Sequence, residues 1–308
     1  MRILITGAGG FIGSHLTKAA LAKQHQVLAL DKFPNSKFNQ RLYTILEDPN
    51  FTQISGDLTN NNDIHDLCID VDIVVNLAGK NSNQKSIITP GPYVETNIQG
   101  TLNLLESARL HIPKLFIQVS TTDVYGINLS GPINEESQIY PATPYAASKA
   151  AAESLCISYF NSYNIPTIIA RPTNIYGPFQ DPTTTIPQWI QKAMEHKAFN
   201  VFGSYLYPML HVQDFCSSIF TLIENGCPGH IYNIANENKF KTSDIAEQII
   251  QATESKSTST TIEDPKKPFT RYSFVTDSIN ELEWQPQINL EEGIKSVVDF
   301  IKLNKWWW

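Results

Sequence analysis

The sequence predicts an α/β protein built around a doubly wound parallel sheet, with a second, smaller lobe of mixed structure. Short apolar, β-branched runs alternate with helical patterns through the first part of the 308-residue chain. A glycine-rich turn directly follows the first of these runs. Beyond Arg171 the alternation weakens and prolines punctuate the chain, which marks the start of the smaller lobe.

The expected strands are short apolar runs bounded by glycine, small or polar residues. They span Ile3 to Thr6, Gln26 to Leu30, Thr52 to Ser55, Asp72 to Leu77, Leu115 to Ser120, Pro166 to Ala170 and Ile231 to Ala235. Helical stretches separate them at a spacing that favours parallel pairing with right-handed crossovers.

The glycine turn lies in the opening sequence MRILITGAGGFIGSHL. Gly7, Gly10 and Gly13 stand between the first strand and a helical pattern that begins at Phe11. Glycine permits a tight turn and lets the backbone approach a pyrophosphate closely, and the following helix N-terminus offers unpaired N–H groups. The order strand, glycine turn and helix therefore predicts a dinucleotide-binding unit.

Polar or small residues close the next three strands. Asp31 follows the last glycine by about 20 residues, where an acidic side chain accepts hydrogen bonds from the adenosine ribose. Its charge would repel a 2′-phosphate, so we expect NAD rather than NADP. Asp57 follows the third strand, and the sequence NLAG at Asn76 to Gly79 closes the fourth, leaving room for a ligand. Simple strand-end turns are the alternative for both.

The stretch TPYAASKAAAES, residues 143–154, predicts a helix that carries chemistry. Thr143 can cap it and Pro144 suits its first turn, so Tyr145 and Lys149 stand four residues apart on one face. A nearby ammonium stabilises a phenolate and lowers the pKa of the tyrosine toward the range needed for proton transfer. Thr121, at the end of the fifth strand in VSTTDVYG, can hold a substrate oxygen together with Tyr145.

Composition and charge exclude several classes of partner. The formal net charge is −7 and the basic residues are scattered, which argues against a nucleic-acid partner. The four cysteines, Cys68, Cys156, Cys216 and Cys227, lie far apart, so neither a metal site nor a disulfide framework is expected. The N-terminus is too short for a signal peptide and no segment reaches membrane-spanning length, so we expect a cytoplasmic protein with no membrane partner.

The expected boundaries divide the chain into two parts. Residues 1–172 form the NAD-binding domain, with a later strand near 211–236 returning to it, and residues 173–210 and 237–308 form a smaller substrate-binding lobe. In that lobe, the polar stretch Ser255 to Thr261 is expected to be a solvated loop.

Three further features of the second part are expected to be structural. Pro172, Pro178, Pro182 and Pro187 indicate loops, and His211 is expected to be structural or exposed. The terminal run 306–308, three tryptophans, is expected to pack against the domain or to form an interface, because it lacks the basic flank of a membrane anchor.

Taken together, the glycine turn, Asp31, NLAG, STTDVYG, YxxxK and RPTNIYGP resemble the extended short-chain dehydrogenase/reductase family, in its nucleotide-sugar epimerase/dehydratase branch. The resemblance implies a Rossmann sheet domain that binds NAD, a C-terminal lobe that binds a nucleotide sugar, and a homodimer. It implies the catalytic residues Thr121, Tyr145 and Lys149. It also implies the cofactor-binding residues Gly7, Gly10, Phe11, Ile12, Gly13, Asp31, Asp57, Leu58, Leu77, Ala78, Tyr145 and Lys149, and the substrate-binding residues Asn174, Tyr207, Arg271, Thr122 and Asp123.

Departures from the family pattern bear on the reaction. Family dehydratases carry an Asp-Glu pair directly after the catalytic hydroxyl residue, whereas this chain has Thr122 and Asp123 there. Thr122 cannot serve as a carboxylic acid, so acid and base roles cannot both be filled in the usual way. Tyr207 stands where many relatives place a phosphate-binding arginine, so Arg171, Arg271 or another donor compensates, or the substrate is not a typical nucleoside diphosphate sugar.

These residues lead to one principal hypothesis and three alternatives. The principal hypothesis is an NAD-dependent nucleotide-sugar epimerase that oxidises the sugar at C4 and returns hydride to the opposite face. A keto-sugar reductase or dehydrogenase would use the same residues, and a 4,6-dehydratase is disfavoured by Thr122. A catalytically silent NAD-binding regulatory protein is the alternative of a different class, which the intact Thr121, Tyr145 and Lys149 argue against.

Overall fold

A central parallel sheet of seven strands dominates the computed structural model, which describes residues 1–32, 40–126, 131–203, 206–262 and 273–307, with the side chain of residue 207 excepted. The strand order is β10-β6-β5-β4-β1-β2-β3. The strands are β1 (Arg2–Thr6), β2 (Gln26–Asp31), β3 (Phe51–Ser55), β4 (Ile73–Asn76), β5 (Leu115–Val119), β6 (Thr167–Pro172) and β10 (Ile231–Ile234). The doubly wound parallel sheet predicted from the sequence is confirmed.

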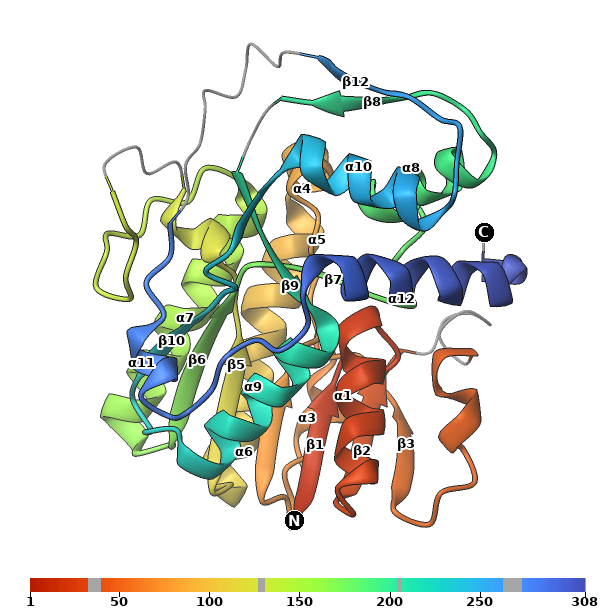
Figure 1. Cartoon of the computed structure of the whole chain (residues 1–308). Helices are drawn as coiled ribbons and strands as arrows, with labels where there is room; N and C mark the ends of the chain where they lie inside the picture. Colours follow the sequence, from red (N-terminus) through yellow and green to blue (C-terminus); the bar gives the residue numbers. More distant parts are fainter. Residues whose placement is uncertain (33–39, 127–130, 204–205, 263–272, 308) are drawn as a thin grey trace. The chain divides into compact units, whose positions relative to one another are not determined.

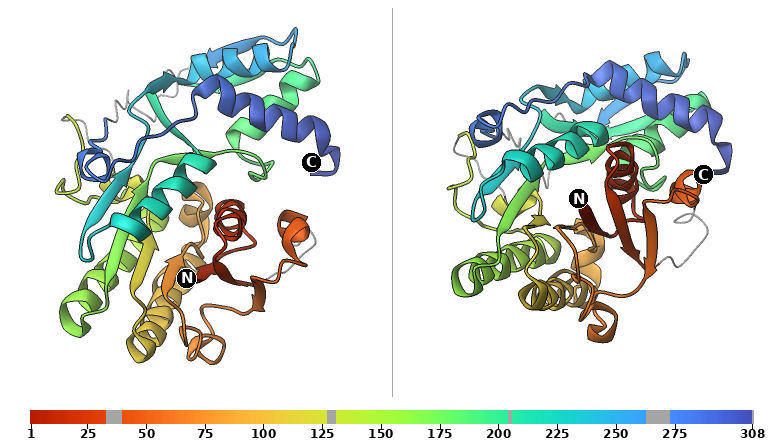
Figure 2. Two further views of the ribbon diagram at one scale, coloured as in Figure 1. Left: turned by 60° about the horizontal axis from the view of Figure 1, so that its bottom comes forward. Right: turned by 90° about the horizontal axis from the view of Figure 1, so that it is seen from below.

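Helices cover both faces of this sheet. Helix α1 (Phe11–Ala22) and helix α9 (Val212–Asn225) lie on one face, while α6 (Gly100–His111) and α7 (Pro144–Tyr163) lie on the other (Figures 1 and 2). Shorter elements complete the connections. They are η1 (Tyr43–Ile45), α3 (Asn61–Ile64), α4 (Asn83–Ile88), α5 (Gly91–Tyr93), the π-helical turn η2 (Val94–Gln99) and η3 (Thr122–Tyr125).

The chain divides into two compact units. Unit 1 comprises residues 1–127, 135–172 and 216–233, and unit 2 comprises residues 128–134, 173–215 and 234–308. The core of unit 1 is a continuous cluster of buried side chains from the sheet and the helices, including Leu4, Val74, Leu104, Phe116 and Ile169. Burial of such side chains supplies most of the stabilisation of a sheet covered on both faces.

Unit 2 contains two small sheets and several helices. One sheet has the order β11-β9-β7 and the other pairs β12 with β8. The strands are β7 (Asn174–Tyr176), β8 (Phe199–Phe202), β9 (Leu206–His211), β11 (Lys239–Lys241) and β12 (Ser259–Ile262). The helices are α8 (Thr185–Met194), α10 (Thr242–Ala252), α11 (Asp277–Asn280), α12 (Leu290–Leu303) and η4 (Lys305–Trp307).

Two sequence-based expectations for unit 2 are wrong. Residues 259–261 of the expected polar loop belong to β12, which pairs in parallel with β8 from Ser259 opposite Phe199. Threonine is β-branched and fits a half-exposed strand, so a polar composition did not exclude one. Pro187 lies inside α8 rather than in a loop, because the first turn of a helix tolerates proline, whose missing N–H would have no helical partner there. Pro172, also expected in a loop, is the last residue of β6 in unit 1, since a strand end tolerates a residue without an N–H.

Of the C-terminal tryptophans, Trp307 packs within unit 2, as expected. Trp307 is buried, and its indole Nε1 donates a 3.0 Å hydrogen bond to the carbonyl oxygen of Gln180. Its ring packs edge-on against Phe179 and Phe300, with centroid distances of 5.5 and 6.1 Å. Trp306 stays half exposed, and residue 308 lies outside the described residues.

Cys68, Cys156 and Cys216 are buried free thiols, and Cys227 is an exposed one. Among the described residues, no helix combines the length and the apolar character that a membrane span requires.

Candidate active site

The glycine turn joins β1 to α1 and is tightly packed. Gly7 has a φ of +68°, and a Cβ at Gly13 would lie 2.1 Å from the carbonyl oxygen of Gly7, so a larger residue fits at neither position. A Cβ at Gly10 would lie 3.0 Å from the same carbonyl oxygen, which is also tight, but among the described residues no other atom outside its own helix and chain neighbours lies within 4 Å. The turn is therefore closed on the protein side, and glycine at position 10 leaves space beside it, as a phosphate group would require.

The N-terminus of α1 is the second part of this phosphate site. Phe11 and Ile12 are its first two residues, and no side chain in the described part of the chain caps it at Gly10. The first N–H groups of a helix carry a partial positive charge and attract anions. Phe11, Ile12 and Gly13 thus fit a pyrophosphate through their backbone N–H groups, while Gly10, whose own N–H donates to the Gly7 carbonyl oxygen at 2.9 Å, leaves room beside them because it has no side chain.

Asp31 ends β2 beside the glycine turn. Its Oδ2 accepts a 3.0 Å hydrogen bond from the backbone N–H of Gly9, and its Oδ1 accepts a 2.7 Å bond from the N–H of Lys32. These backbone bonds fix the carboxylate at the carboxyl edge of the sheet. That position matches the one expected of a ribose-binding acid.

Asp57 and Leu58 follow β3. The Asp57 carboxylate accepts from the N–H of Thr59 and forms a 2.5 Å ion pair with Lys32. These partners keep the pKa of Asp57 below its usual value, although desolvation opposes them. The buried Leu58 packs against Gly100, where a Cβ would approach it to 2.9 Å.

A buried polar network fixes the end of β4 against β1. The Thr6 hydroxyl donates to Oδ1 of Asn76 at 2.6 Å and accepts from the N–H of Ala78 at 3.1 Å. Asn76 in turn donates to Gln118 on β5. Leu77 and Ala78 are therefore held directly beside Gly7, whose Cβ would lie 2.9 Å from the Ala78 backbone.

The end of β5 carries the hydroxyl and carboxyl groups. The Thr121 side chain accepts from the N–H of Asp123 at 3.2 Å and so caps η3, in which Thr122 is buried. The Asp123 carboxylate accepts a 2.8 Å hydrogen bond from the amide of Asn83, and Asn83 accepts from Thr143, the N-cap of α7. The hydroxyl of Ser120 is buried and has no partner among the described residues.

Helix α7 presents Tyr145 and Lys149 to this strand end, and both are buried. Burial raises the pKa of the Tyr145 phenol, Asp123 raises it further, and a hydrogen bond with Thr121 opposes the rise. Burial lowers the pKa of Lys149 to about 8, while the charge of Glu153 opposes that change. The Lys149 ammonium donates to the carbonyl oxygen of Val119 at 2.5 Å. The structure thus brings Thr121 and Tyr145 together, with Lys149 bonded to the same strand end. The expectation that Lys149 lowers the pKa of Tyr145 is wrong for this structure, because burial and Asp123 raise that pKa and the Lys149 ammonium is directed to the Val119 carbonyl.

Sequence reasoning missed the role of Asn97 beside this set. Asn97 lies in the π-helical turn η2, and its side chain bonds both the N–H and the carbonyl of Lys80 and the hydroxyl of Ser148. It therefore ties the loop after β4 to α7, one residue before Lys149. Its position in the segment NIQG was the available signal, but a π-turn has no recognised sequence pattern and is often found at functional sites.

The proposed substrate-binding residues of the second part are less defined. Asn174 is the exposed first residue of β7 in unit 2. Tyr207 lies in β9, with its side chain outside the description, and Arg271 lies outside the described residues. The suggestion that Arg171 replaces a phosphate-binding arginine is wrong, because its guanidinium is buried and bonded to Glu153 and Tyr125.

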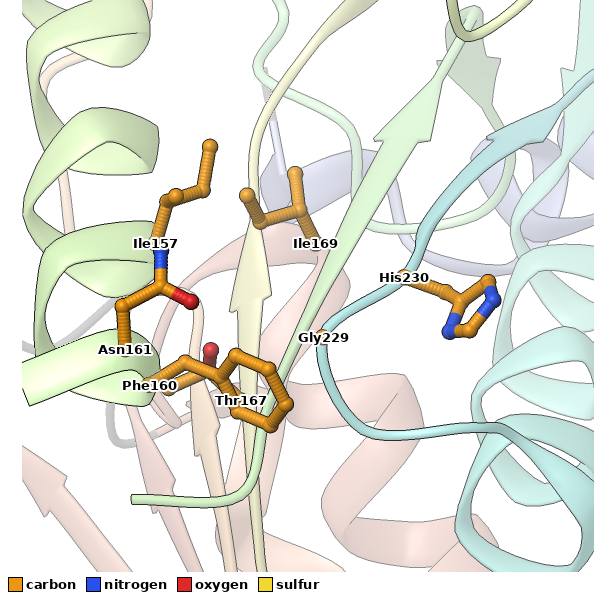
Figure 3. A pocket seen from close by; sticks show the side chains of 7 residues that line it. All are labelled: Ile157, Phe160, Asn161, Thr167, Ile169, Gly229 and His230. Atoms are coloured by element: carbon orange, nitrogen blue, oxygen red, sulfur yellow. The ribbon is translucent and has the colours of Figure 1, made fainter. Parts of the chain in front are cut away.

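Two other features lie apart from the site. His211 is buried, and its Nε2 lies 3.1 Å from the hydroxyl of Ser296 within unit 2, as a structural histidine would. Figure 3 shows a small cavity of about 120 Å³ lined by Ile157, Phe160, Asn161, Thr167, Ile169, Gly229 and His230. Thr167 begins β6, so this cavity lies at the amino end of the strand, whereas the candidate site lies at the carboxyl ends.

The chain is similar to known enzymes over nearly its whole length. A family model described as "NAD dependent epimerase/dehydratase family" matches residues 3–235. The low-salt glycan biosynthesis protein Agl12 of Haloferax volcanii is 32% identical over 97% of this chain and 98% of its own length. The dTDP-glucose 4,6-dehydratase of Streptomyces niveus is 32% identical over 100% of this chain and 95% of its own length.

Solved structures of nucleotide-sugar dehydratases and epimerases are also similar to this chain over nearly its whole length. DesIV, a dTDP-glucose 4,6-dehydratase from Streptomyces venezuelae with NAD and TYD bound, has a TM-score of 0.92 at 28% identity, covering 100% of this chain and 99% of that one. A UDP-glucuronic acid 4-epimerase from Bacillus cereus, in complex with UDP-glucuronic acid and NAD, has a TM-score of 0.91 at 28% identity. The match covers 98% of this chain and 99% of that one. The similarity thus extends to enzymes of two reaction types.

Proposed function

Because the chain belongs to the NAD-dependent epimerase/dehydratase family, we propose that it is a nucleotide-sugar 4-epimerase. The family is NAD-dependent, and the glycine turn, the uncapped N-terminus of α1 and the fixed Asp31 carboxylate fit that dinucleotide. Its pyrophosphate would bind to Gly10, Phe11, Ile12 and Gly13, and its adenosine ribose to Asp31.

One observation carries the choice of epimerisation. The residues after Thr121 supply a single carboxyl group, that of Asp123, because Thr122 is a buried hydroxyl residue. Loss of water from a sugar requires one group to protonate the leaving hydroxyl and another to remove a carbon-bound proton. Epimerisation at C4 requires only one group that takes a proton from the C4 hydroxyl and later gives it back.

Tyr145 is the group proposed to move this proton. Its phenolate would accept the C4 hydroxyl proton, and the Lys149 ammonium would stabilise the phenolate charge. The Thr121 hydroxyl, which already bonds Tyr145, would hold the sugar oxygen in place. Bound NAD would supply the hydride acceptor and would be regenerated when hydride returns to the opposite face of the keto sugar.

A 4,6-dehydratase is the second candidate. The full-length relatives named as dTDP-glucose 4,6-dehydratases support it, and so does the presence of the Asp123 carboxylate beside Tyr145. Asp123 would then have to serve as both acid and base.

A reductase or dehydrogenase would use the same Thr121, Tyr145 and Lys149 but would release its oxidised or reduced cofactor after each turnover.

The test is incubation of the purified protein and NAD with a panel of UDP- and dTDP-linked sugars, followed by mass spectrometry and NMR. The proposal expects an isomer of unchanged mass and no net formation of NADH. A product lighter by one water would establish dehydration instead, and stoichiometric NADH would establish a dehydrogenase.

Tyr145→Phe tests whether the protein is an enzyme at all. We expect a loss of turnover of at least about 10²-fold, because the group that transfers the proton is gone. NAD affinity, measured by calorimetry, is expected to stay within about twofold, since the aromatic ring is retained. Unchanged turnover would contradict the catalytic role, and absence of turnover in the unmodified protein on every sugar would favour a regulatory NAD-binding protein.

The homodimer and the cytoplasmic location remain predictions.

A further inference from the structure

Glu153 and Arg171 form a buried ion pair inside unit 1. Each side chain is only 1% exposed, and the guanidinium binds the carboxylate through two parallel bonds of 3.0 Å and 2.7 Å. Removing two charges from water costs several kcal/mol per ion, so such a pair is weak evidence for a stabilising role. Its presence in the core calls for another explanation.

The pair connects the two halves of the candidate active site. Glu153 lies on α7 one helical turn after Lys149. The same Arg171 guanidinium donates a 2.8 Å bond to the hydroxyl of Tyr125, the last residue of η3, which Thr121 begins as its N-cap. Tyr125 is fixed in turn by Asn233 on β10. The Glu153 carboxylate is therefore held in one position relative to Lys149.

We propose that Glu153 is a positioning residue for the reaction, whose fixed carboxylate keeps the buried Lys149 ammonium charged at the pH of turnover. This inference rests on the proposed role of Lys149 in catalysis. Arg171 acts indirectly, because it holds the carboxylate ionised and in place.

The surroundings of Lys149 explain why a nearby anion is needed. Burial disfavours the ammonium and lowers its pKa to about 8, and the charges of Glu153 and Cys156 are the opposing influences. The hydrogen-bond partner of the ammonium is neutral, since it is the Val119 carbonyl on β5, and the backbone of Gly79 lies close by, because a Cβ there would be 4.0 Å from Nζ. Asp123 of η3 and Tyr93 of α5 act on the phenol of Tyr145. As Cys156 is a buried thiol whose pKa is raised, Glu153 is the main negative charge acting on Lys149.

A direct test measures the charge of Lys149 without turnover. The protein is labelled with 13C at the lysine Cε, and the Lys149 signal, assigned by its loss in Lys149→Arg, is followed against pH. We expect an inflection near pH 8 in the unmodified protein, and one about one pH unit lower in Glu153→Gln, which keeps the shape but removes the charge. Glu153→Asp, which keeps the charge, is expected to restore most of the difference.

An unchanged inflection in Glu153→Gln would overturn the proposal, and so would equal changes in the Gln and Asp variants, which would indicate a role in packing alone. Glu153→Gln leaves Arg171 without its partner, so it can fail to fold. In that case the double variant Glu153→Gln with Arg171→Met removes both charges. Because this double variant removes a cation together with the anion, its inflection is expected to lie below that of the unmodified protein but by less than about one pH unit, and an inflection at the unmodified value would overturn the proposal.

The kinetic consequence is a shift in the pH profile. The alkaline limb of kcat is expected to move down by about one pH unit in Glu153→Gln, because Lys149 then loses its proton at lower pH. Glu195→Gln, which removes a surface partner of Lys197, is the matched control and should leave the profile unchanged. If no nucleotide sugar is converted by any variant, the proposed function fails, while the NMR titration still decides the role of Glu153.

Discussion

At the scale of single residues, Lys149, the proposed partner of Tyr145 in catalysis, shows what burial of a charged group costs. Burial lowers the pKa of Lys149 from its usual 10.5 to about 8 in the folded protein. Between these values the unfolded chain binds more protons than the folded one, so this lysine makes the free energy of unfolding rise with pH over that window. Below pH 8 the residue opposes folding.

Lys149→Met is therefore expected to increase stability at pH 7 by about 1–3 kcal/mol, because it replaces a buried ammonium by an apolar chain of similar size. Turnover should be lost at the same time. Urea unfolding at pH 7 and pH 10 measures the effect, and the difference between the variants should shrink at the higher pH. A variant less stable than the parent at pH 7 would show that the Val119 contact outweighs desolvation.

Asp31 is the residue proposed to determine, through its charge, the choice between NAD and NADP. Asp31→Asn retains an oxygen that can accept from the N–H of Gly9, but it removes the carboxylate that would repel a 2′-phosphate. We expect the ratio of NADP to NAD affinity to rise by about tenfold, or about 1.4 kcal/mol. Titration calorimetry with both dinucleotides measures this ratio. Asp48→Asn, a surface change, is the control, and an unchanged ratio in Asp31→Asn would remove Asp31 from the cofactor site.

At the scale of elements, local sequence predicted some features and missed others. Thr143 and Pro144 predicted the start of α7, and the structure begins the helix there because the Thr143 hydroxyl accepts from the N–H of Ala146. The Glu153–Arg171 pair joins a helix to a strand, and no spacing along the chain indicates such a contact. The two-stranded pairing of β12 with β8 likewise depends on a distant segment.

The C-terminal turn η4 stabilises the loop that follows β7. Phe179 in that loop has a positive φ of 65°, which costs energy for a residue with a side chain, and Trp307 and Phe300 pack against its ring. Trp307→Ala should remove this packing together with the bond to Gln180. We expect a loss of about 3–5 kcal/mol in stability.

Thermal unfolding of Trp307→Ala beside Trp306→Ala tests this role. Trp306 is half exposed, so its variant should change stability by less than about 1 kcal/mol. Equal effects of the two variants would mean that the buried indole contributes nothing particular to unit 2.

At the scale of the whole molecule, the sequence was sufficient for the fold class, the family and the cofactor, all of which are confirmed. The glycine turn and the strands of unit 1 are encoded locally, since each depends on a few neighbouring residues such as Gly7 and Ile3. The reaction type is not encoded in the same way. Our proposal rests it on two side chains, Thr122 and Asp123, within a scaffold that both dehydratases and epimerases share.

The burial of the cysteines makes their reactivity toward thiol reagents a measure of local unfolding. Cys68, Cys156 and Cys216 are buried in the folded state, and Cys156 lies in the helix that carries Lys149, whereas Cys227 is exposed. A thiol reagent would therefore modify Cys227 at once and the other three only when their surroundings transiently unfold. The rate at which Cys156 is modified would therefore measure how often helix α7, which carries Tyr145 and Lys149, transiently unfolds.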